Sequence, residues 1–491
     1  MTLDQKQKVV IALAFFFMVA LAIVAWVEGG RSRVVHAPDA VVTAENRDCV
    51  DCHRVKSPGI VGQWEISTHA QSGIGCMQCH AAAEGDIDGY DHEGQIIATI
   101  VTPNDCAQCH ERETAEFQAS HHASAGQILG SLDNVLAEVV EGFVEFDAQG
   151  NKVRPSAAAV SGCLQCHGSE IKVLEDGKLD PATWPNTGIG RINPDGTRGS
   201  CSACHLRHNF SRAQARAPEN CGRCHLGPDH PQKEVYDESK HGIAFYANRT
   251  RFEPLMEEQE WIPGKEFEQG PTCTVCHMGA TKNLPVTHDV GERISWTLRP
   301  PVSEKIDAAA LKAGKQVKTW ENRRKDMREV CNSCHATEWV DNWYLQFDGA
   351  VELYNEKFGR PSTELYQMAR SSGLLTGTAF DEELEFTYFF LWHHEGRRAR
   401  HGAAMMGPDY TQWHGFYEVA HRFYMEFVPQ LREVIAEGRH SGKGAAASRL
   451  ETRLNEVMNS EMHKWFLGKM SPGEMAARQR AAEEFKKRYA Q

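Results

Sequence analysis

The sequence predicts a mainly α-helical protein with a few short β-hairpins. Three observations support this fold class. Beyond residue 336, apolar residues recur every three or four positions, which is the period of helices that bury one face. Alternating apolar and polar residues, the pattern of a half-buried strand, occur only in brief stretches. The 16 cysteines fall in regular close pairs, so their spacing organises the first two thirds of the chain.

Length and charge narrow the class further. A chain of 491 residues can bury a large core and form two or three domains. Its 66 acidic and 53 basic side chains give a net charge of -13, which leaves no general basic surface for phosphates and argues against nucleic acid as a partner. The mean hydropathy of -0.48 excludes a protein that crosses a membrane many times.

Every cysteine belongs to a C-x-x-C pair, and a histidine directly follows every pair. We call these motifs boxes 1 to 8, in chain order. The cysteines are Cys49, Cys52, Cys76, Cys79, Cys106, Cys109, Cys163, Cys166, Cys201, Cys204, Cys221, Cys224, Cys273, Cys276, Cys331 and Cys334. The histidines are His53, His80, His110, His167, His205, His225, His277 and His335.

C-x-x-C-H is the attachment motif of c-type haem. The two thiols bond to the porphyrin vinyl groups, and the short loop brings the imidazole under the ring as the proximal iron ligand. Structural zinc would join the pairs two by two and would not require a histidine after every pair. Thioredoxin-like redox pairs occur singly, and eight in one chain have no mechanistic purpose. The sequence therefore predicts eight covalently bound c-type haems, which must also fill much of the core.

Away from the boxes, the pattern predicts small hairpins and then long helices. The hairpins are expected at Gln95–Val101 and Val139–Val153. A helical lead-in runs from Ser303 to Val330. The helices that follow are Glu338–Phe358, Asp381–Arg400, Tyr410–Glu437 and Arg449–Leu467, with breaks at Gly359-Arg-Pro361, Gly407-Pro408 and Gly438. This haem-free region must pack on the haem domain or on another subunit.

Residues 9–27 carry no charge and would span about 28 Å as a helix, enough to cross a bilayer. A cleaved signal peptide usually has a shorter apolar core and a small-residue cleavage site, and the best candidate here, Val35-His36-Ala37, is followed by Pro38. We therefore expect a retained N-terminal transmembrane anchor, with a removed signal as the alternative.

Flanking charges and the box positions predict orientation and domains. Lys6 and Lys8 favour a cytoplasmic N-terminus, although Arg31 and Arg33 on the other side weaken the argument. With an anchor or a signal, the haem domain is expected on the periplasmic or extracytoplasmic side. The expected parts are residues 1–8 (cytoplasmic N-terminus), 9–27 (transmembrane anchor or signal), 28–46 (linker), 47–336 (octahaem domain) and 337–491 (helical region that completes the active site and a trimer interface).

The other histidines supply candidate second ligands to iron. Eight of the 24 histidines belong to boxes, which leaves 16. If seven haems are low-spin electron carriers and one keeps an open face for substrate, seven more ligands are needed, and methionine is not excluded. Small neighbouring residues, which let a haem approach, favour His69, His121 or His122, His241 and His288; further candidates are His92, His394, His401 and His414. Polar or linker contexts predict that His36, His440 and His463 are solvated.

Eight C-x-x-C-H boxes, followed by a haem-free helical region with Tyr and His near its end, resemble the octahaem hydroxylamine oxidoreductase family. That family includes hydrazine dehydrogenases and reductive relatives, and the resemblance covers residues 47–470. In the family the fourth box holds the catalytic haem, which is of the P-460 type. The resemblance therefore implies that Cys163, Cys166 and His167 hold the catalytic haem here.

The resemblance also implies an acid–base pair. The segment Cys221-Gly-Arg-Cys-His-Leu-Gly-Pro-Asp-His-Pro231 looks like the family stretch that carries an Asp-His pair into the active site. This makes Asp229 and His230 catalytic candidates, because a carboxylate can fix the tautomer of an imidazole that titrates near neutral pH. The alternative is a plain turn before Pro231 with a solvent-facing Asp229.

In oxidative members of the family, a tyrosine from the neighbouring subunit of a trimer is cross-linked to the catalytic haem. The matching segment here is Met406–Tyr417, which offers Tyr410 and Tyr417. A tyrosine bonded to the porphyrin would favour extraction of electrons, whereas an unmodified haem would suit reduction. The alternative is that these tyrosines belong to an ordinary aromatic helix face.

Three functions follow as expectations. The first is oxidation of hydroxylamine, to nitric oxide or nitrite, with electrons leaving through seven bis-histidine haems to a cytochrome or a quinone-linked membrane protein. The second is the reverse chemistry, as a nitrite or hydroxylamine reductase with an uncross-linked haem. The third is a non-catalytic electron-transfer cytochrome, although about 150 haem-free residues after box 8 exceed what electron transfer needs. The resemblance further implies a homotrimer.

Overall fold

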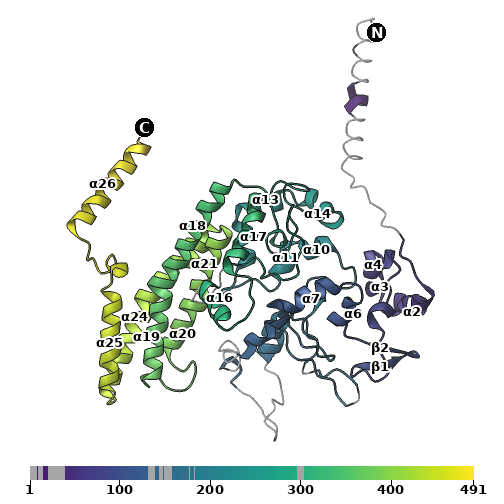
Figure 1. Ribbon diagram of the computed structural model, residues 1–491, viewed down its shortest axis with the longest axis horizontal. Helices are drawn as coiled ribbons and strands as arrows, with labels where there is room; N and C mark the ends of the chain where they lie inside the picture. Colours follow the sequence, from purple (N-terminus) through teal and green to yellow (C-terminus); the bar gives the residue numbers. More distant parts are fainter. Residues whose placement is uncertain are drawn as a thin grey trace. The chain divides into compact units, whose positions relative to one another are not determined.

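The computed structural model describes residues 39–130, 139–142, 157–175, 177–181, 183–295 and 303–490, together with residues 8, 15–19 and 148. The chain divides into two compact units, Met1–Gly75 and Cys76–Gln491. The structure is mainly helical, as the sequence predicts, and the one sheet in its described part has two short strands (Figure 1).

The first unit carries box 1 on a short helix. Its elements are η1 (Ala44–Asn46), α2 (Arg47–Lys56), α3 (Pro58–Glu65) and α4 (Thr68–Gln71). The Trp64 indole donates a hydrogen bond to the Ile74 carbonyl at 2.9 Å, and Val50 and Val61 are buried beneath it. His69 lies on α4, whose first turn is capped by the side chain of Ser67.

The predicted hairpin beside Gln95 is confirmed. Strand β1 (Gly89–His92) pairs antiparallel with β2 (Gln95–Ala98), and both turn residues, Glu93 and Gly94, have positive φ. Such a two-residue turn matches the natural twist of a hairpin. The second predicted hairpin, Val139–Val153, lies mostly outside the described residues, and residues 139–141 are helical.

Short helices separated by loops hold boxes 2 to 8, and each box lies in or directly beside one of them. Haem attachment needs only a local turn, so long elements are not required here. The elements are α5 (Met77–His80), α6 (Pro103–Ala107), α7 (Glu111–Ala119), η2 (His122–Gly130), η3 (Ala159–Cys163), α9 (Leu164–His167), η4 (Cys201–Ala203), α10 (Arg212–Arg216), α11 (Pro218–Gly222), α12 (Gln232–Glu238), α13 (Lys240–Ala247), α14 (Arg249–Glu258), α15 (Cys273–His277), α16 (Ser303–Lys312) and α17 (Trp320–Asn332).

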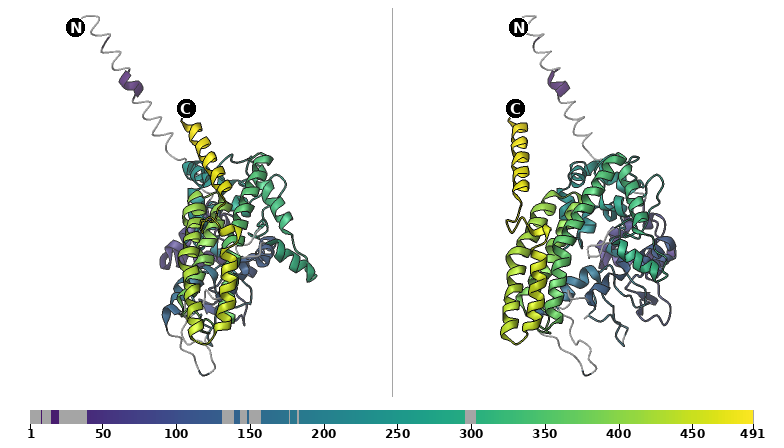
Figure 2. Two further views of the ribbon diagram at one scale, coloured as in Figure 1. Left: turned by 90° about the vertical axis from the view of Figure 1, so that its left-hand side faces the viewer. Right: turned by 60° about the vertical axis from the view of Figure 1, so that its left-hand side comes forward.

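Long helices follow box 8, and several of them run alongside one another (Figure 2). Their core is made of aliphatic and aromatic side chains between Tyr354 and Met458. The elements are α18 (Thr337–Tyr354), η5 (Asn355–Gly359), α19 (Arg360–Ser371), α20 (Glu383–Phe389), η6 (Phe390–Glu395), α21 (Gly396–Met405), α22 (Pro408–Thr411), η7 (Gln412–Tyr417), α23 (Glu418–Arg422), η8 (Phe423–Phe427), α24 (Val428–His440), α25 (Gly444–Met458), η9 (Glu461–His463) and α26 (Pro472–Tyr489).

Of the three predicted helix breaks, one is confirmed and two are wrong. The chain does break at Gly407-Pro408, after Met406 adopts a left-handed conformation. At Gly359-Arg-Pro361 the helix continues through η5 into α19, because Pro361 occupies a first turn that needs no N–H donor. Gly438 lies inside α24, where a Cβ would clash with Leu374, so this glycine serves packing.

The predicted anchor at residues 9–27 lies outside the described residues except for a helical piece at 15–19. Within the part of the chain that the structure describes, no helix combines the length and apolar character needed to cross a bilayer.

Candidate haem sites and active site

Three pairs of imidazoles that join a box histidine to a predicted second ligand have the separation that a shared iron requires. An iron about 2 Å from each ligating nitrogen places the two ring centres roughly 6 Å apart. In each pair one histidine belongs to a box and the other is a predicted second ligand. The pairs are His225 with His122 at 6.0 Å, His205 with His288 at 6.5 Å, and His335 with His241 at 6.1 Å. These residues fit c-type haems at boxes 5, 6 and 8.

The protonation of these histidines also suits iron binding. Burial, with a smaller contribution from neighbouring imidazoles, lowers the pKa of His122 to about 4 and that of His225 to about 3. Both rings are therefore neutral near pH 7 and keep a lone pair for a metal. The Nδ1 atoms of His80 and His167 contact the carbonyl oxygens of Ala98 and Ala125, at 2.9 and 3.2 Å, which leaves Nε2 available for iron.

Cysteines of different boxes interact electrostatically or through hydrogen bonds, and these interactions connect the boxes into a branched chain. Boxes 2, 3, 5, 6, 7 and 8 follow one another in a line, and box 4 joins this line at box 6. The interacting thiols are Cys79 with Cys106, Cys106 with Cys201, Cys204 with Cys221, Cys221 with Cys273, Cys276 with Cys331, and Cys166 with Cys224. Haems attached there would lie close enough to exchange electrons.

Asp229 and His230 lie beside the junction of boxes 4 and 6. His230 Nδ1 is 2.5 Å from Asp229 Oδ1, and His230 Nε2 is 2.7 Å from the carbonyl oxygen of Cys224. The carbonyl oxygen is an acceptor, so Nε2 carries a proton, and Nδ1 lies next to the carboxylate charge. His230 also acts electrostatically on the thiol of Cys166 in box 4. The predicted pair and the predicted catalytic box therefore lie together.

The charges of the pair support each other. Burial raises the pKa of Asp229, but the adjacent His230, together with His393 and Arg397, outweighs it and holds the pKa at about 2. Burial lowers the pKa of His230, but the Asp229 carboxylate outweighs this and raises the pKa above its ordinary value. The geometry is that of an ionised carboxylate and an imidazolium.

Two residues that the sequence analysis missed complete the cluster. Arg397 Nη1 is 3.3 Å and His393 Nδ1 is 3.9 Å from Asp229 Oδ2. They come from α21 and η6, 164 residues or more along the chain from Asp229. No local motif could have indicated a contact across this separation.

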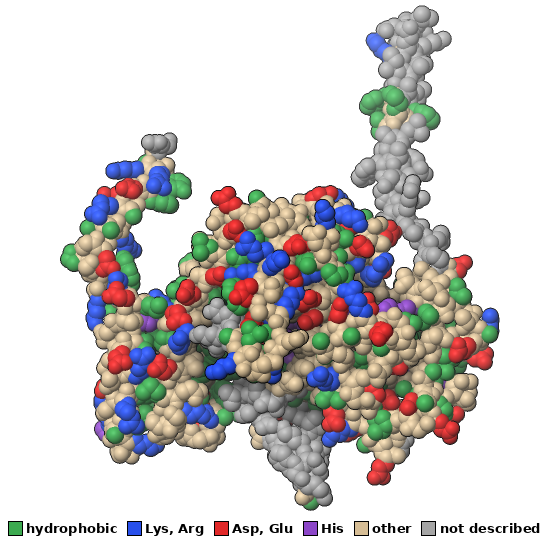
Figure 3. Space-filling model, in the orientation of Figure 1, with side chains coloured by type: hydrophobic (Ala, Val, Ile, Leu, Met, Phe, Trp, Pro, Cys, Tyr) green, Lys and Arg blue, Asp and Glu red, His purple; other side chains and the backbone are tan. Residues whose placement is uncertain are grey.

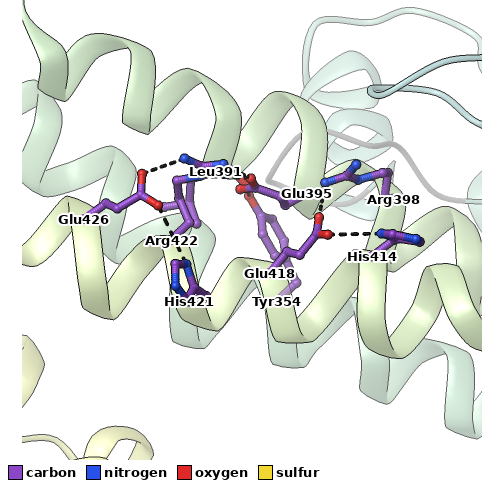
Figure 4. Close-up of polar contacts among 9 residues, drawn as sticks. All are labelled: Tyr354, Leu391, Glu395, Arg398, His414, Glu418, His421, Arg422 and Glu426. Carbon is purple, nitrogen blue, oxygen red and sulfur yellow. Dashed lines mark hydrogen bonds and ion pairs between the residues drawn. The ribbon is translucent and has the colours of Figure 1, made fainter.

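The outer side of η6 and α21 is held by a network of ion pairs (Figure 4). Glu395, only 2% exposed, accepts hydrogen bonds from Arg422 at 2.7 and 2.9 Å. Arg422 also pairs with Glu426 at 2.6 Å, and Glu418 contacts both Arg398 and His414. Partly buried ion pairs of this kind are costly to break, so the network fixes the helices that carry His393 and Arg397.

The two candidate tyrosines have different surroundings. Tyr410 is half-buried on α22, and its backbone N–H donates to Glu238 at 3.3 Å. Tyr417 is 54% exposed at the end of η7 and forms one wall of a groove of about 520 Å³. Nothing in the described contacts brings either ring to His167.

The other candidate ligands are spread over the molecule. His401 is buried beside Gln232, whose amide lies 3.3 Å from its Nε2, and it interacts with His230 and His225. His394 lines the groove beside Tyr417. His414 is an exposed residue that contacts Asp409 and Glu418, while His92 is exposed on β1 and His121 on the loop before η2.

His463 corrects one expectation, and His208 adds a candidate. His463 was expected in solvent but is only 1% exposed. Its Nδ1 is hydrogen-bonded to the Tyr424 hydroxyl at 2.7 Å, and its ring stacks on Phe423. Burial lowers the pKa of His208 to about 4, with a further contribution from nearby His80. His208 is therefore a candidate second ligand for box 2, and its position three residues after box 5 gave no spacing signal.

Comparisons with known families agree with this arrangement. Residues 190–381 match the family described as "Seven times multi-haem cytochrome CxxCH", and residues 28–81 and 105–189 match "Cytochrome c554 and c-prime". These matches support a multihaem cytochrome c with covalently bound c-type haems. The number of eight haems and a tyrosine cross-link remain predictions.

Individual relatives extend the comparison. This multihaem cytochrome is 25% identical over 353 residues to a probable nitrite reductase-hydroxylamine oxidoreductase fusion protein of Kuenenia stuttgartiensis. The aligned segment covers 61% of this chain and 35% of that protein. The chain thus spans about a third of the length of this curated relative.

Two solved structures are similar in fold. A hypothetical multihaem protein aligns with a TM-score of 0.68 and 26% identity, over 83% of this chain and 100% of the other. A chain of a reducing HAO-like protein complex of Kuenenia stuttgartiensis aligns with a TM-score of 0.52 and 20% identity, over 84% of this chain and 86% of the other. The second likeness concerns the fold alone.

Proposed function

We propose that this multihaem cytochrome is an oxidoreductase of hydroxylamine and related small nitrogen compounds, with the reaction at the haem of box 4. The observation that carries the proposal is the cluster of Asp229, His230 and Arg397 beside Cys166. Perturbed, partly buried titratable groups next to a metal cofactor are typical of active sites. The name of the Kuenenia relative supports the same substrate class.

The protein residues would position substrate and move protons. When bound at His167, the haem supplies an iron that binds a substrate nitrogen and exchanges electrons with box 6. His230 holds a proton at Nδ1 and at Nε2, and it can deliver or recover one as the substrate changes charge. Asp229 orients this imidazole, and Arg397 and His393 hold the carboxylate in place.

In the oxidative form of the proposal, hydroxylamine is converted to nitric oxide or nitrite at a P-460-type haem. Tyr410 or Tyr417 from a neighbouring subunit would then be bonded to the porphyrin. Mass spectrometry of protease fragments that contain Cys163–His167 tests this directly. A haem that also carries a Tyr410 or Tyr417 peptide supports oxidation, and a haem without a tyrosine contradicts it.

The reductive form is favoured by one specific observation. The adjacent Asp229 carboxylate raises the pKa of His230, and Nε2 donates to a carbonyl oxygen, so the residue acts as a proton donor. Cleavage of an N–O bond during reduction consumes protons, and Arg397 adds positive charge that attracts an anion such as nitrite.

Turnover assays separate the two directions. We expect the haem-loaded protein to reduce nitrite or hydroxylamine with a small reduced dye, or to oxidise hydroxylamine with an oxidised dye. The spectrum of the ferrous protein should contain one high-spin haem. Purely low-spin haems with no turnover in either direction would leave electron transfer as the only function and overturn the proposal.

We further propose that the protein is a homotrimer on the extracytoplasmic side of a membrane, anchored by residues 9–27. A stripe of exposed side chains at four-residue spacing supports a helix-to-helix interface; its members are Trp413, Tyr417, His421 and Met425. Sedimentation analysis tests the assembly, and partition between membrane and soluble fractions tests the anchor. A monomer, or a soluble full-length chain, would contradict the respective part.

A further inference from the structure

Box 8 is at one end of the line of boxes. Cys331 interacts with Cys276 of box 7, and the structure gives no thiol contact from box 8 to a further box among the described residues. Cys334 is exposed to solvent, unlike the cysteines of boxes 5, 6 and 7. The ring centres of His335 and His241 are 6.1 Å apart, which fits a bis-histidine haem between α13 and the start of α18. A haem at this place is terminal and close to the surface.

An exposed aromatic ring lies directly against this box. The indole of Trp339 stacks on the imidazole of His335, with ring centres 4.3 Å apart and an interplanar angle of 15°. Trp339 is nevertheless 45% exposed, and Leu345, on the same helix, is 68% exposed. Large apolar side chains that remain in solvent beside a redox centre are typical of a contact surface.

The charged side chains of α18 itself are all acidic. Helix α18 carries four carboxylates, Glu338, Asp341, Asp348 and Glu352, and no lysine or arginine. Asp341 and Asp348 are paired with arginines of α17 at the edge of the exposed face. Glu338 and Glu352 lie on the exposed face itself, so it presents apolar side chains within a negative rim.

We propose that the exposed face of α18 is the docking surface for a small electron-transfer protein whose cofactor edge is surrounded by lysines. Trp339, near the start of α18, would contact the partner beside box 8, and the carboxylates would face its lysines along the helix. A positive rim on the partner complements the negative one here, which raises the association rate and orients the two cofactors. The small apolar centre fits a weak, transient complex, which electron exchange between proteins requires. This proposal does not depend on which nitrogen compound reacts at box 4.

Stopped-flow electron exchange with the full-length, haem-loaded protein tests the surface without any nitrogen substrate. The probe is a small basic c-type cytochrome, and an acidic c-type cytochrome of similar potential is the comparison. We expect the basic probe to react about tenfold faster or more at low ionic strength, and this advantage to shrink as salt is added. Equal rates for both probes would overturn the proposal.

Charge reversal on α18 gives a second readout. The double variant Glu338→Lys with Glu352→Lys should slow the basic probe about tenfold at low salt and accelerate the acidic one. The matched control, Glu433→Lys with Glu437→Lys on the exposed side of α24, changes the net charge equally and should alter either rate less than about twofold. An equal effect of both double variants would mean that only net charge matters, and it would contradict a local surface.

Trp339 is tested separately because it also contacts His335. Trp339→Ala should slow exchange with the basic probe several-fold at every ionic strength, whereas Trp339→Phe should restore most of the rate. The haem spectrum and the dye-driven turnover of nitrogen compounds report whether the variants are intact. Absence of turnover in the wild-type protein, together with normal electron exchange, would contradict the proposed function and leave this surface standing. A second copy of the protein could also cover α18. Hydrogen exchange that slows in this helix when the wild-type protein self-associates would contradict a docking surface for an electron-transfer protein.

Discussion

Asp229 and His230 depend on each other for their charges. The carboxylate stays ionised because an imidazolium and a guanidinium surround it, and the imidazole stays protonated because it faces the carboxylate. A raised histidine pKa means that the favourable interaction is fully present below the ordinary histidine pKa of about 6.5 and is lost as the pH rises through the raised value.

The substitution Asp229→Asn should therefore change both the rate and its pH dependence. We expect turnover of the nitrogen substrate to fall about 100-fold or more, since a general acid loses its orienting partner. The alkaline limb of the pH profile should also shift to lower pH, because the pKa of His230 falls. The same substitution at exposed Asp91 is the control and should change neither. An unchanged limb in Asp229→Asn would mean that another group titrates.

Removal of a single second ligand gives a spectroscopic prediction. In His122→Ala, the haem attached at His225 loses its second imidazole, so one low-spin haem should become high-spin. Electron paramagnetic resonance measures the change. His440→Ala removes an exposed histidine and should leave the spectrum as it is. An unchanged proportion of high-spin haem in His122→Ala would assign the ligand elsewhere.

Individual residues differ in how far the sequence reveals them. The boxes are local covalent motifs, so their cysteines and histidines can be identified without a structure. His122 and His241 were recognised only as members of a larger set, because small neighbours permit ligation but do not name a partner. Arg397 and His393 could not be found, since their contact with Asp229 exists only after α21 folds back on box 6.

At the scale of elements, η6 and α21 carry His393 and Arg397 of the proposed active-site cluster, and α21 packs tightly against α18. Gly396, at the start of α21, faces the ring of Tyr354, whose hydroxyl donates to the carbonyl of Leu391 at 3.4 Å. The guanidinium of Arg400 lies 4.2 Å from the centre of the same ring. The close approach of the two helices therefore requires a residue without a side chain at this point.

Two glycine substitutions test this packing. In Gly396→Ala the new Cβ clashes with the ring of Tyr354, and we expect a loss of about 1–3 kcal/mol in stability together with reduced turnover. In Gly349→Ala, on the exposed side of α18, the new Cβ meets nothing, and stability should rise by up to about 1 kcal/mol. Thermal unfolding of the haem-loaded proteins measures both. Equal melting temperatures would show that α18 and α21 can separate without cost.

Helix existence was easier to predict than helix limits. Apolar periodicity located the helices around Glu338, Asp381, Tyr410 and Arg449, because one buried face leaves a repeating pattern. Glycine was a poor guide to their ends: Gly438 is helical because Leu374 occupies the space of its missing side chain. Helix α19 was not predicted, since Pro361 was taken as a break.

On the scale of the whole molecule, the core is expected to be filled by haem around the boxes and by side chains in the helices that follow box 8. The region of boxes 2 to 8 has short elements and many loops, whereas the helices between Tyr354 and Met458 share a continuous aliphatic and aromatic core. Acidic and basic side chains are mixed over the face seen in Figure 3.

A protein made without haem attachment should therefore be stable in only one of these regions. We expect residues 354–458 to keep slow hydrogen exchange, because their core contains no cofactor. The segments around boxes 2 to 8 should exchange rapidly and be cut by protease. The haem-loaded protein, in which both regions are protected, is the comparison. Equal protection of both regions in the haem-free chain would show that porphyrins are not needed for folding.

The side position of box 4 affects how a multi-electron conversion can proceed. Because box 4 joins the line at box 6, with boxes on both sides, haems attached to these boxes would store electrons for the proposed reaction. Electrons would be collected one at a time during infrequent collisions with a redox partner. Several of them would then pass to the haem of box 4 in one turnover. Reactive half-converted nitrogen species would then have little time to escape, even when the external supply is intermittent.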